Sequence, residues 1–211
     1  MKKLILTLVS VVLLSGQLAA GWLEDLTDYA ENELEPVVSD IGAVIGTGQI
    51  GSSLSFPGLE AGIKLNTAEI TDTELIDTEM DQLIIPAVSA GAALPAGISL
   101  NARGMAFELP ETSNSMTWVG ASGKYSVIKD KTISPLPGIS ALAGYNIFTV
   151  KDIITVSNLS VGAVVEKSLP LVTPYAGLAY DINKGKIETD LGDIEPESNF
   201  IRYEAGVSLK L

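Results

Sequence analysis

The feature that most constrains this chain is a two-residue alternation of apolar and polar side chains, which begins after Pro57 and continues to the C-terminus. The clearest segment is 199–211, where alternate positions from Ile201 to Leu211 are apolar and the positions between them are charged or small. Successive side chains of a β-strand point to opposite faces, so this period indicates strands with one apolar and one polar face. We therefore predict a mainly β protein with eight strands. The eight segments are 58–66, 84–93, 97–107, 116–128, 138–148, 156–166, 173–182 and 199–211.

The lengths of the connections between these segments suggest how the strands are joined. The two longest connections, 67–83 and 183–198, are the first and the last, so an up-and-down meander places both at the same end. Most connections at the other end are shorter. An even number of strands, short turns at one end and longer loops at the other are typical of outer-membrane β-barrels. Four tyrosines on the apolar face are predicted near strand ends, where an interfacial aromatic belt belongs. These are Tyr125, Tyr145, Tyr180 and Tyr203.

Residues 1–20 carry a separate pattern. Lys2 and Lys3 precede an apolar run from Leu4 to Leu14, and small residues follow it. This order is typical of a cleaved secretory signal peptide, which takes no part in the fold. The alternative, a membrane-anchoring helix, is disfavoured because a spanning helix needs about 20 apolar residues. We therefore expect an exported protein.

The segment 21–57 is predicted to be acidic and helical, ending in a Gly-rich linker. Apolar residues between Trp22 and Val44 recur mostly three or four positions apart, which is helical periodicity. Pro36 has no N–H, so we expect two short helices with a break near Glu35. Two interpretations remain open. The segment is either a plug or docking element that covers an opening, or a solvated amphipathic helix packed on the main domain.

A signal peptide followed by eight alternating strands of roughly ten residues resembles the small bacterial outer-membrane β-barrel proteins. The closing segment Phe200–Leu211 is similar to their terminal strand, and the helical stretch before the first strand resembles that of uncharacterised barrel families with an N-terminal helix. The resemblance implies an eight-stranded antiparallel transmembrane β-barrel at 58–211 in the outer membrane of a two-membraned bacterium. It also implies outer-membrane lipid and the barrel-assembly machinery as partners, and an interior mostly filled by side chains.

Charged residues within the strands share the polar face. A charge facing lipid at mid-membrane costs about 2–4 kcal/mol for Arg or Lys, so this face is predicted to point into the barrel. Two interpretations of these charges remain open: a satisfied salt-bridge network that fills the barrel, or a narrow pore for ions or small solutes. The predicted lumen-facing charges are Glu60, Lys64, Arg103, Lys124, Glu166, Arg202 and Glu204.

The composition excludes several kinds of chemistry. The chain of 211 residues has no His and no Cys, so it has no imidazole base, no thiol nucleophile and no ordinary zinc site. We expect no enzymatic activity and no cofactor. A net charge of −13 argues against a nucleic-acid binder, because few cations are present to neutralise phosphates. The acidic stretch Asp72–Asp81 offers oxygen ligands suited to Ca²⁺, but it lacks the glycine and spacing of an EF-hand loop, and we expect no metal site.

Two function classes follow from this pattern. The first is a structural, anchoring or surface-interaction role, in which the barrel holds acidic loops outside the cell. The second is a narrow channel or transporter for a small solute or apolar ligand, gated by the segment 22–48. A secreted soluble β-sandwich would alternate in the same way. It is disfavoured because its outer faces should be richer in Lys, Glu, Asp and Thr than these strands are.

Overall fold

The computed structural model of this chain describes residues 31–51, 54, 56–69, 82–108, 115–130, 136–189 and 192–209. The predicted signal peptide at 1–20 and the acidic stretch Asp72–Asp81 lie outside the described residues, as does the start of the predicted helical segment. Within the described part, the chain is mainly β, with one helix before a single antiparallel sheet. No helix among the described residues is long and apolar enough to cross a membrane.

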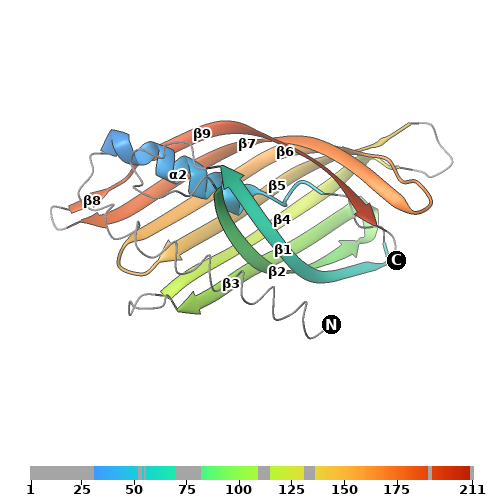
Figure 1. Ribbon diagram of the computed structural model, residues 1–211. Coiled ribbons are helices and arrows are strands. Elements are labelled where there is room, and N and C mark those ends of the chain that lie inside the picture. Colours follow the sequence, from blue (N-terminus) through green and yellow to red (C-terminus); the bar gives the residue numbers. More distant parts are fainter. Residues whose placement is uncertain are drawn as a thin grey trace.

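The strands pair in chain order, each antiparallel to its neighbour (Figure 1). The bounds are β1 Gly58–Glu69, β2 Gln82–Leu94, β3 Ile98–Glu108, β4 Ser115–Ile128, β5 Gly138–Val150, β6 Ile154–Glu166, β7 Val172–Thr189, β8 Gly192–Ile194 and β9 Glu197–Leu209. Each of the eight predicted segments falls on a strand over its described residues, except that Gly97 belongs to the 3-10 turn Pro95–Gly97, and the structure adds a ninth, short strand. The short β8 and the long β9 both pair with β7, on either side of Glu195–Pro196. They therefore act as one interrupted eighth strand.

The prediction that residues 183–198 form a long connection is wrong. β7 continues to Thr189, and β8 and β9 return along it, so most of this stretch is sheet. Three ion pairs on one side of the hairpin join its charged side chains. These are Lys184–Glu197, Lys186–Glu188 and Lys186–Asp193. The many acids of the stretch suggested a loop, whereas in the structure Glu188, Asp193 and Glu197 lie on strands and pair with lysines.

The sheet has an apolar outer face, whereas its inner face carries the polar and charged side chains of the strands together with the apolar side chains that pack on the helix. Leu59, Val161 and Tyr203 point outward and are 87%, 54% and 73% exposed, whereas the polar residues at the positions between them point inward. The predicted assignment of alternate side chains to the two faces of the strands is therefore confirmed. The described strands form one sheet rather than two packed sheets, so the β-sandwich alternative is wrong. Of the four belt tyrosines only Tyr125 lies near a strand end, because the other three fall in the middle of β5, β7 and β9.

The helix α2, Glu31–Gly46, lies on the inner side of the curled sheet (Figure 1). It contacts strands at both ends of the strand order, β1 and β2 as well as β7 and β9, together with β5 and β6. Its apolar side chains form one core with apolar side chains from the strands, including Trp118, Phe148 and Ile187. Residues 37–46 are all buried or half-buried, so this part of the helix packs on the sheet, as one of the two interpretations has it, but it is not solvated.

The expected break near Glu35 is also wrong, because α2 runs through Pro36 without interruption. Proline at this sixth position removes one backbone hydrogen bond, to the carbonyl of residue 32. The residues that follow, including Val37, Val38 and Ile41, are almost completely buried against the strands. Burial of side chains of this size stabilises by about 1.5–3 kcal/mol each, which offsets the lost bond.

The sheet is not closed into a barrel. Among the described residues, β1 pairs only with β2, and β9 pairs only with β7. β1 and β9 therefore remain as two edges, and we call the space between them the seam. The wall of eight long strands curls around α2 but is not joined by β1–β9 hydrogen bonds.

Candidate functional site

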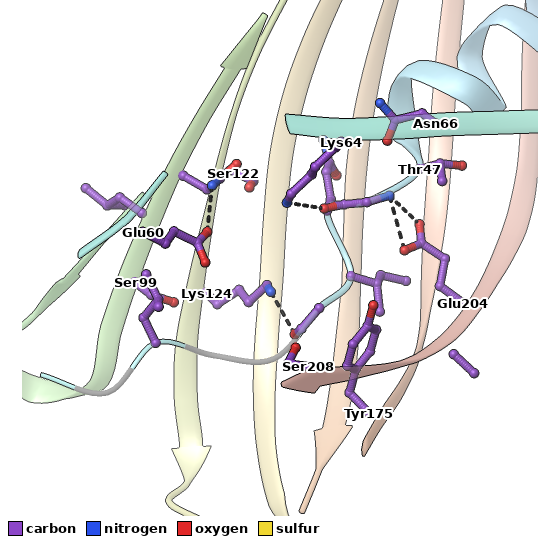
Figure 2. Close-up of a pocket in the computed structure, with 18 of the residues that line it drawn as sticks. Thr47, Glu60, Lys64, Asn66, Ser99, Ser122, Lys124, Tyr175, Glu204 and Ser208 are labelled. Atoms are coloured by element: carbon purple, nitrogen blue, oxygen red, sulfur yellow. Dashed lines mark hydrogen bonds between the residues drawn. The ribbon is translucent and has the colours of Figure 1, made fainter. Parts of the chain in front are cut away.

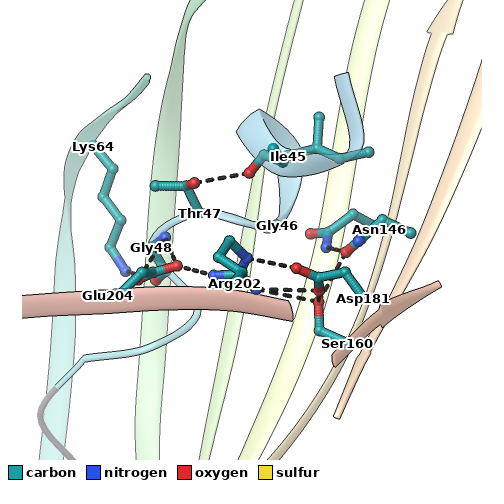
Figure 3. A network of polar contacts seen from close by, with 12 residues as sticks. Ile45, Gly46, Thr47, Gly48, Lys64, Asn146, Ser160, Asp181, Arg202 and Glu204 are labelled. Atoms are coloured by element: carbon teal, nitrogen blue, oxygen red, sulfur yellow. Dashed lines mark hydrogen bonds and ion pairs between the residues drawn. The ribbon is translucent and has the colours of Figure 1, made fainter. Parts of the chain in front are cut away.

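An ion-pair network lies on the inner face, beside the C-terminal end of α2. Arg202 on β9 places Nε 2.7 Å from Oδ2 of Asp181 on β7, and it also contacts Glu204 and Ser160 (Figure 3). Ser160 in turn donates a hydrogen bond to Asp181. Arg202, Asp181 and Ser160 are all buried. The hydrogen bonds and ion pairs of this network give partners to charges that are enclosed away from water.

Arg103 on β3 holds the end of the helix. Its guanidinium donates hydrogen bonds to the carbonyls of Ile45 and Thr47, and to Oδ1 of Asn146 at 3.0 Å. The guanidinium carbon also lies 5.0 Å from the centroid of the Trp118 ring, within cation–π range. The last carbonyls of a helix lack partners within the helix and carry partial negative charge. Arg103 therefore caps α2 from the inner wall of the sheet.

Three asparagines form a buried ladder beneath the helix. Asn146 donates to Asn158 and Asn158 donates to Asn183, each at 2.8 Å, across the paired strands β5, β6 and β7. All three are fully buried. Gly42 of α2 packs directly on this ladder, because a Cβ at that position would lie 2.2 Å from Oδ1 of Asn183. The helix can approach the sheet this closely only with glycine at this position.

The turn after the helix bridges the seam. The Gly48 carbonyl accepts a hydrogen bond from Lys64 Nζ on β1 at 3.2 Å, and the Gly48 N–H donates to the Glu204 carboxylate on β9 at 3.2 Å. Gly48 has a φ of 78°, a left-handed conformation that glycine adopts readily. One residue thus connects two strands that do not pair with each other among the described residues.

A cavity of about 610 Å³ lies next to this bridge (Figure 2). Its wall includes Glu60 and Lys64 from β1, Lys124 from β4, Tyr175 from β7 and Glu204 from β9. Lys124 Nζ donates to the Gly51 carbonyl at 2.8 Å, and Glu60 accepts from Asn101 Nδ2 at 2.9 Å. The cavity therefore carries charges of both signs, held mainly by main-chain and amide partners.

The structure brings most of the seven predicted charges together. Arg202 and Glu204 are paired directly, and Lys64 is joined to Glu204 through Gly48. Arg103, Glu166 and Arg202 are buried, Lys64, Lys124 and Glu204 are half-buried, and Glu60 is exposed within the cavity. Glu166, at the end of β6, does not line the cavity.

Several residues of the site were missed by the sequence analysis. Asp181 could have been found from the alternation. Leu178 and Tyr180 point outward, so the side chain of Asp181, at an odd-numbered position between outward residues, is expected to point inward. The asparagine ladder had no sequence signal, because its members come together only through strand register. The contact between Arg103 and the carbonyls at the end of the helix was also not predicted. No sequence pattern near Arg103 or near the helix indicates that they meet.

A second polar cluster joins two connections at the end of the sheet where β1 begins. Lys167 Nζ lies 3.0 Å from Oδ1 of Asp130, and the Ser168 N–H donates to the same carboxylate. Burial of Asp130 raises its pKa, but the hydrogen bonds from Ser168 and Lys167 outweigh this effect and hold the pKa below its ordinary value. The cluster ties the β4–β5 connection to the β6–β7 connection.

Comparisons with known proteins identify no relative. A scan against protein-family models finds no match, and searches of curated proteins and of solved structures find none either. Within the part of the chain that the structure describes, no group of three or more acidic side chains is arranged to hold a metal ion.

Proposed function

We propose that this protein is an exported outer-membrane β-barrel of a two-membraned bacterium, with an anchoring and surface-interaction role. The observation that carries the proposal is the inverted polarity of the sheet. Apolar side chains such as Ile63, Val161 and Leu178 are exposed on the outer face, while charged and amide side chains are enclosed. A water-soluble sheet buries its apolar face, whereas a sheet facing lipid exposes it.

The outer face of β7 supports a membrane boundary. Its outward positions are apolar or small from Val172 to Ile182, and they are charged at Lys184, Lys186 and Glu188. The apolar part matches the about 9–11 residues with which a tilted strand crosses a bilayer. The charged hairpin of β7 and β8 would then project beyond the lipid, at the end of the sheet where β1 ends and β2 begins.

Closure of the barrel is part of the proposal. Unpaired backbone groups cost several kcal/mol each in a bilayer, so open edges are not stable there. Eight long strands in meander order bring β1 and β9 together antiparallel, which allows them to pair once inserted. Outer-membrane lipid is the main partner, and the barrel-assembly machinery is the expected partner during insertion.

An anchoring role is favoured over conduction because α2 and buried polar networks occupy much of the space on the inner side of the sheet. α2 packs against six strands, and the Arg103 and Arg202 networks fill the space beside its C-terminal end. The proposed role is therefore to hold the acidic loops at the cell surface, where they contact other molecules. We propose no catalytic role and no cofactor.

The first test is electrophoresis in SDS of the protein from the membrane fraction, boiled and unboiled. A closed, detergent-resistant barrel should migrate differently before and after boiling. The same sample should float with liposomes in a density gradient. Recovery in the soluble fraction without a mobility shift would contradict the proposal.

The second candidate function is a narrow conduit blocked by α2, and the cavity beside Gly48 is the observation that favours it. A Gly42→Cys/Asn183→Cys variant would tether the helix, because a Cβ at Gly42 would lie 2.4 Å from Cγ of Asn183. The natural chain has no cysteine to compete. In planar bilayers, conductance that appears only after reduction of the tether supports a gated conduit. If no conductance is seen either before or after reduction, and the disulfide is shown to form, the result supports the anchoring role.

A further inference from the structure

The pairing of the strands fixes which residues of the two seam edges lie level with each other. Each register continues into the next, so an inward residue of β1 can be followed across the wall to β9. The row that starts at Gly62 passes through Ser89, Arg103, Gly120, Asn146, Asn158 and Asn183 and ends at Ser198. Lys64 lies two residues after Gly62, so its level on the antiparallel edge is two residues before Ser198, at Pro196.

The contacts across the seam join residues at different levels. Gly48 accepts a hydrogen bond from Lys64 on β1 and donates to Glu204 on β9, each at 3.2 Å (Figure 3). Glu204 lies eight residues after Pro196, so this contact is staggered by eight residues from the level row. The wall of the cavity beside Gly48 has the same offset, because it also takes Glu60 four residues before Lys64 and Ser208 four residues after Glu204.

A stagger of this size is what an eight-stranded wall needs in order to close. Strand tilt and stagger are linked in barrels, and eight residues in an eight-stranded barrel correspond to a tilt of about 36°. Outer-membrane barrels have tilts of about 35–45°. The stagger must also be an even number, since inward side chains of β1 then lie opposite inward side chains of β9. Six and ten residues are therefore the nearest alternatives to eight.

Two inward glycines favour eight over these alternatives. A Cβ at Gly206 on β9 would lie 2.5 Å from Oη of Tyr175, its partner on β7, so the tip of this side chain covers Gly206 from the inside. A Cβ at Gly62 on β1 would meet no heavy atom within 4 Å. A stagger of eight places Gly62 opposite Gly206 and leaves room for the Tyr175 ring. A stagger of six or ten places the long side chain of Glu60 or Lys64 there instead.

We propose that β1 and β9 close the barrel with Lys64 opposite Glu204 and Gly62 opposite Gly206, and that the Gly48 turn holds the two edges in this register before they pair. The inference rests on the closure in lipid that the proposed function includes. It adds the partner of each edge residue and gives the segment that follows α2 a role in assembly. Once the edges pair, Lys64 and Glu204 form a cross-strand pair of opposite charge, which is favourable.

The register is tested by disulfide trapping of the full-length protein in phosphatidylcholine vesicles. Ile63→Cys is combined in turn with Ala205→Cys and with the matched controls Tyr203→Cys and Val207→Cys. All four positions are exposed on the outer face, and the natural chain has no cysteine. Directly opposite residues have Cβ atoms about 4.5–5.5 Å apart and diagonal neighbours about 7–8 Å, so a disulfide favours the opposite pair. Oxidation should trap the Ala205→Cys pair at least about tenfold faster than either control.

The other outcomes of trapping separate the register from the proposed function. Fastest trapping with Tyr203→Cys or Val207→Cys would mean a stagger of six or ten residues and would overturn the register. A heat-dependent mobility shift in SDS without trapping of any of the three pairs would overturn it as well. A natural chain that shows no mobility shift would count against closure itself, and hence against the proposed function.

The glycine contact has a separate test, because Gly62 and Tyr175 meet only in the closed register. Gly62→Val should lower the temperature at which the unboiled mobility is lost, since the added side chain would meet the Tyr175 ring. In a Tyr175→Ala background the same substitution should have little effect. An equal effect of Gly62→Val in both backgrounds would overturn the contact.

The role of the Gly48 turn is tested by the rate of refolding from urea into vesicles, followed by the appearance of the unboiled form. Lys64→Ala/Glu204→Ala removes both bonds to Gly48 and should slow refolding several-fold. The matched control Lys184→Ala/Glu197→Ala removes the same two residue types from an exposed ion pair between β7 and β9, and it should refold at the natural rate. Equal rates for the two variants would overturn the assembly role of the turn.

Discussion

Arg202 on β9 and Asp181 on β7 form a buried ion pair, with Nε 2.7 Å from Oδ2 and side chains that are 7% and 0% exposed. A few residues away, on the same two strands, Lys184 and Glu197 form a second pair at 2.5 Å with side chains 60% and 56% exposed. The two pairs join the same strands, yet they differ in their access to water. They therefore allow a direct comparison of buried and exposed charge in one sheet.

We expect Asp181→Asn to lower the free energy of unfolding by about 3–5 kcal/mol, because it leaves the buried Arg202 charge with Glu204 as its one carboxylate partner among the described residues. Glu197→Gln breaks the exposed pair and should cost no more than about 1 kcal/mol. Urea unfolding of both variants in the same detergent measures the difference. Equal effects would mean that the inner network is hydrated.

Substitution of Gly42 tests how closely α2 lies on the asparagine ladder. Gly42→Ala adds a Cβ that would lie 2.2 Å from Oδ1 of Asn183, so the ladder must shift and the hydrogen bond from Asn158 is strained. We expect a loss of about 1–3 kcal/mol in the free energy of unfolding. In the Gly42→Ala/Asn183→Ala double variant the two effects should not add, because the clash is removed. Strict additivity would show that the two residues are not in contact.

A charge on the outer face tests the lipid contact. Val161 points outward from the middle of β6, so Val161→Arg should cost about 2–4 kcal/mol in a bilayer. Ser157 lies on the same face of the same strand, opposite Lys184 where the outer face becomes charged, and Ser157→Arg should have a small effect. Unfolding in lipid vesicles measures both. Equal tolerance of the two arginines would indicate an outer face in water.

The cluster at Asp130 predicts a pH dependence. The pKa of this carboxyl lies below its ordinary value of 3.8, so the ionised form is the one stabilised by folding. Its contribution to stability is complete above the unfolded pKa and is lost as the pH falls through the lower, folded pKa. Asp130→Asn should therefore lower the thermal unfolding temperature at pH 7. At a pH below both pKa values, the variant and the natural protein should unfold at similar temperatures.

Lys167→Gln provides a check on that interpretation. It removes the ammonium that lies 3.0 Å from the Asp130 carboxylate but leaves the Ser168 N–H in place. The variant should retain part of the pH dependence, because a backbone donor still favours the ionised carboxylate. A complete loss would assign the whole effect to the ion pair.

The strand positions and the direction of their side chains could be predicted from the sequence, because a period of two is a local property of the chain. The same period assigned the seven charged residues to the polar face of the strands. The bounds of the helix were predicted less accurately than those of the strands. Pro36 predicted a break that did not occur, since burial of Val37, Val38 and Ile41 outweighs one lost hydrogen bond. Propensity is a weak guide where a helix buries large apolar side chains against a sheet.

The sequence by itself determined the eight alternating segments, the inverted choice of faces and the absence of His and Cys chemistry. Only the tertiary structure decided that α2 occupies the inside of the sheet, that Arg103 caps its last carbonyls and that Gly48 bridges β1 and β9. The physical reason is separation along the chain. Alternation depends on neighbours two residues apart, whereas Arg103 lies 56 positions from Thr47 and Gly48 lies 156 positions from Glu204. Strand register and packing alone bring these residues together.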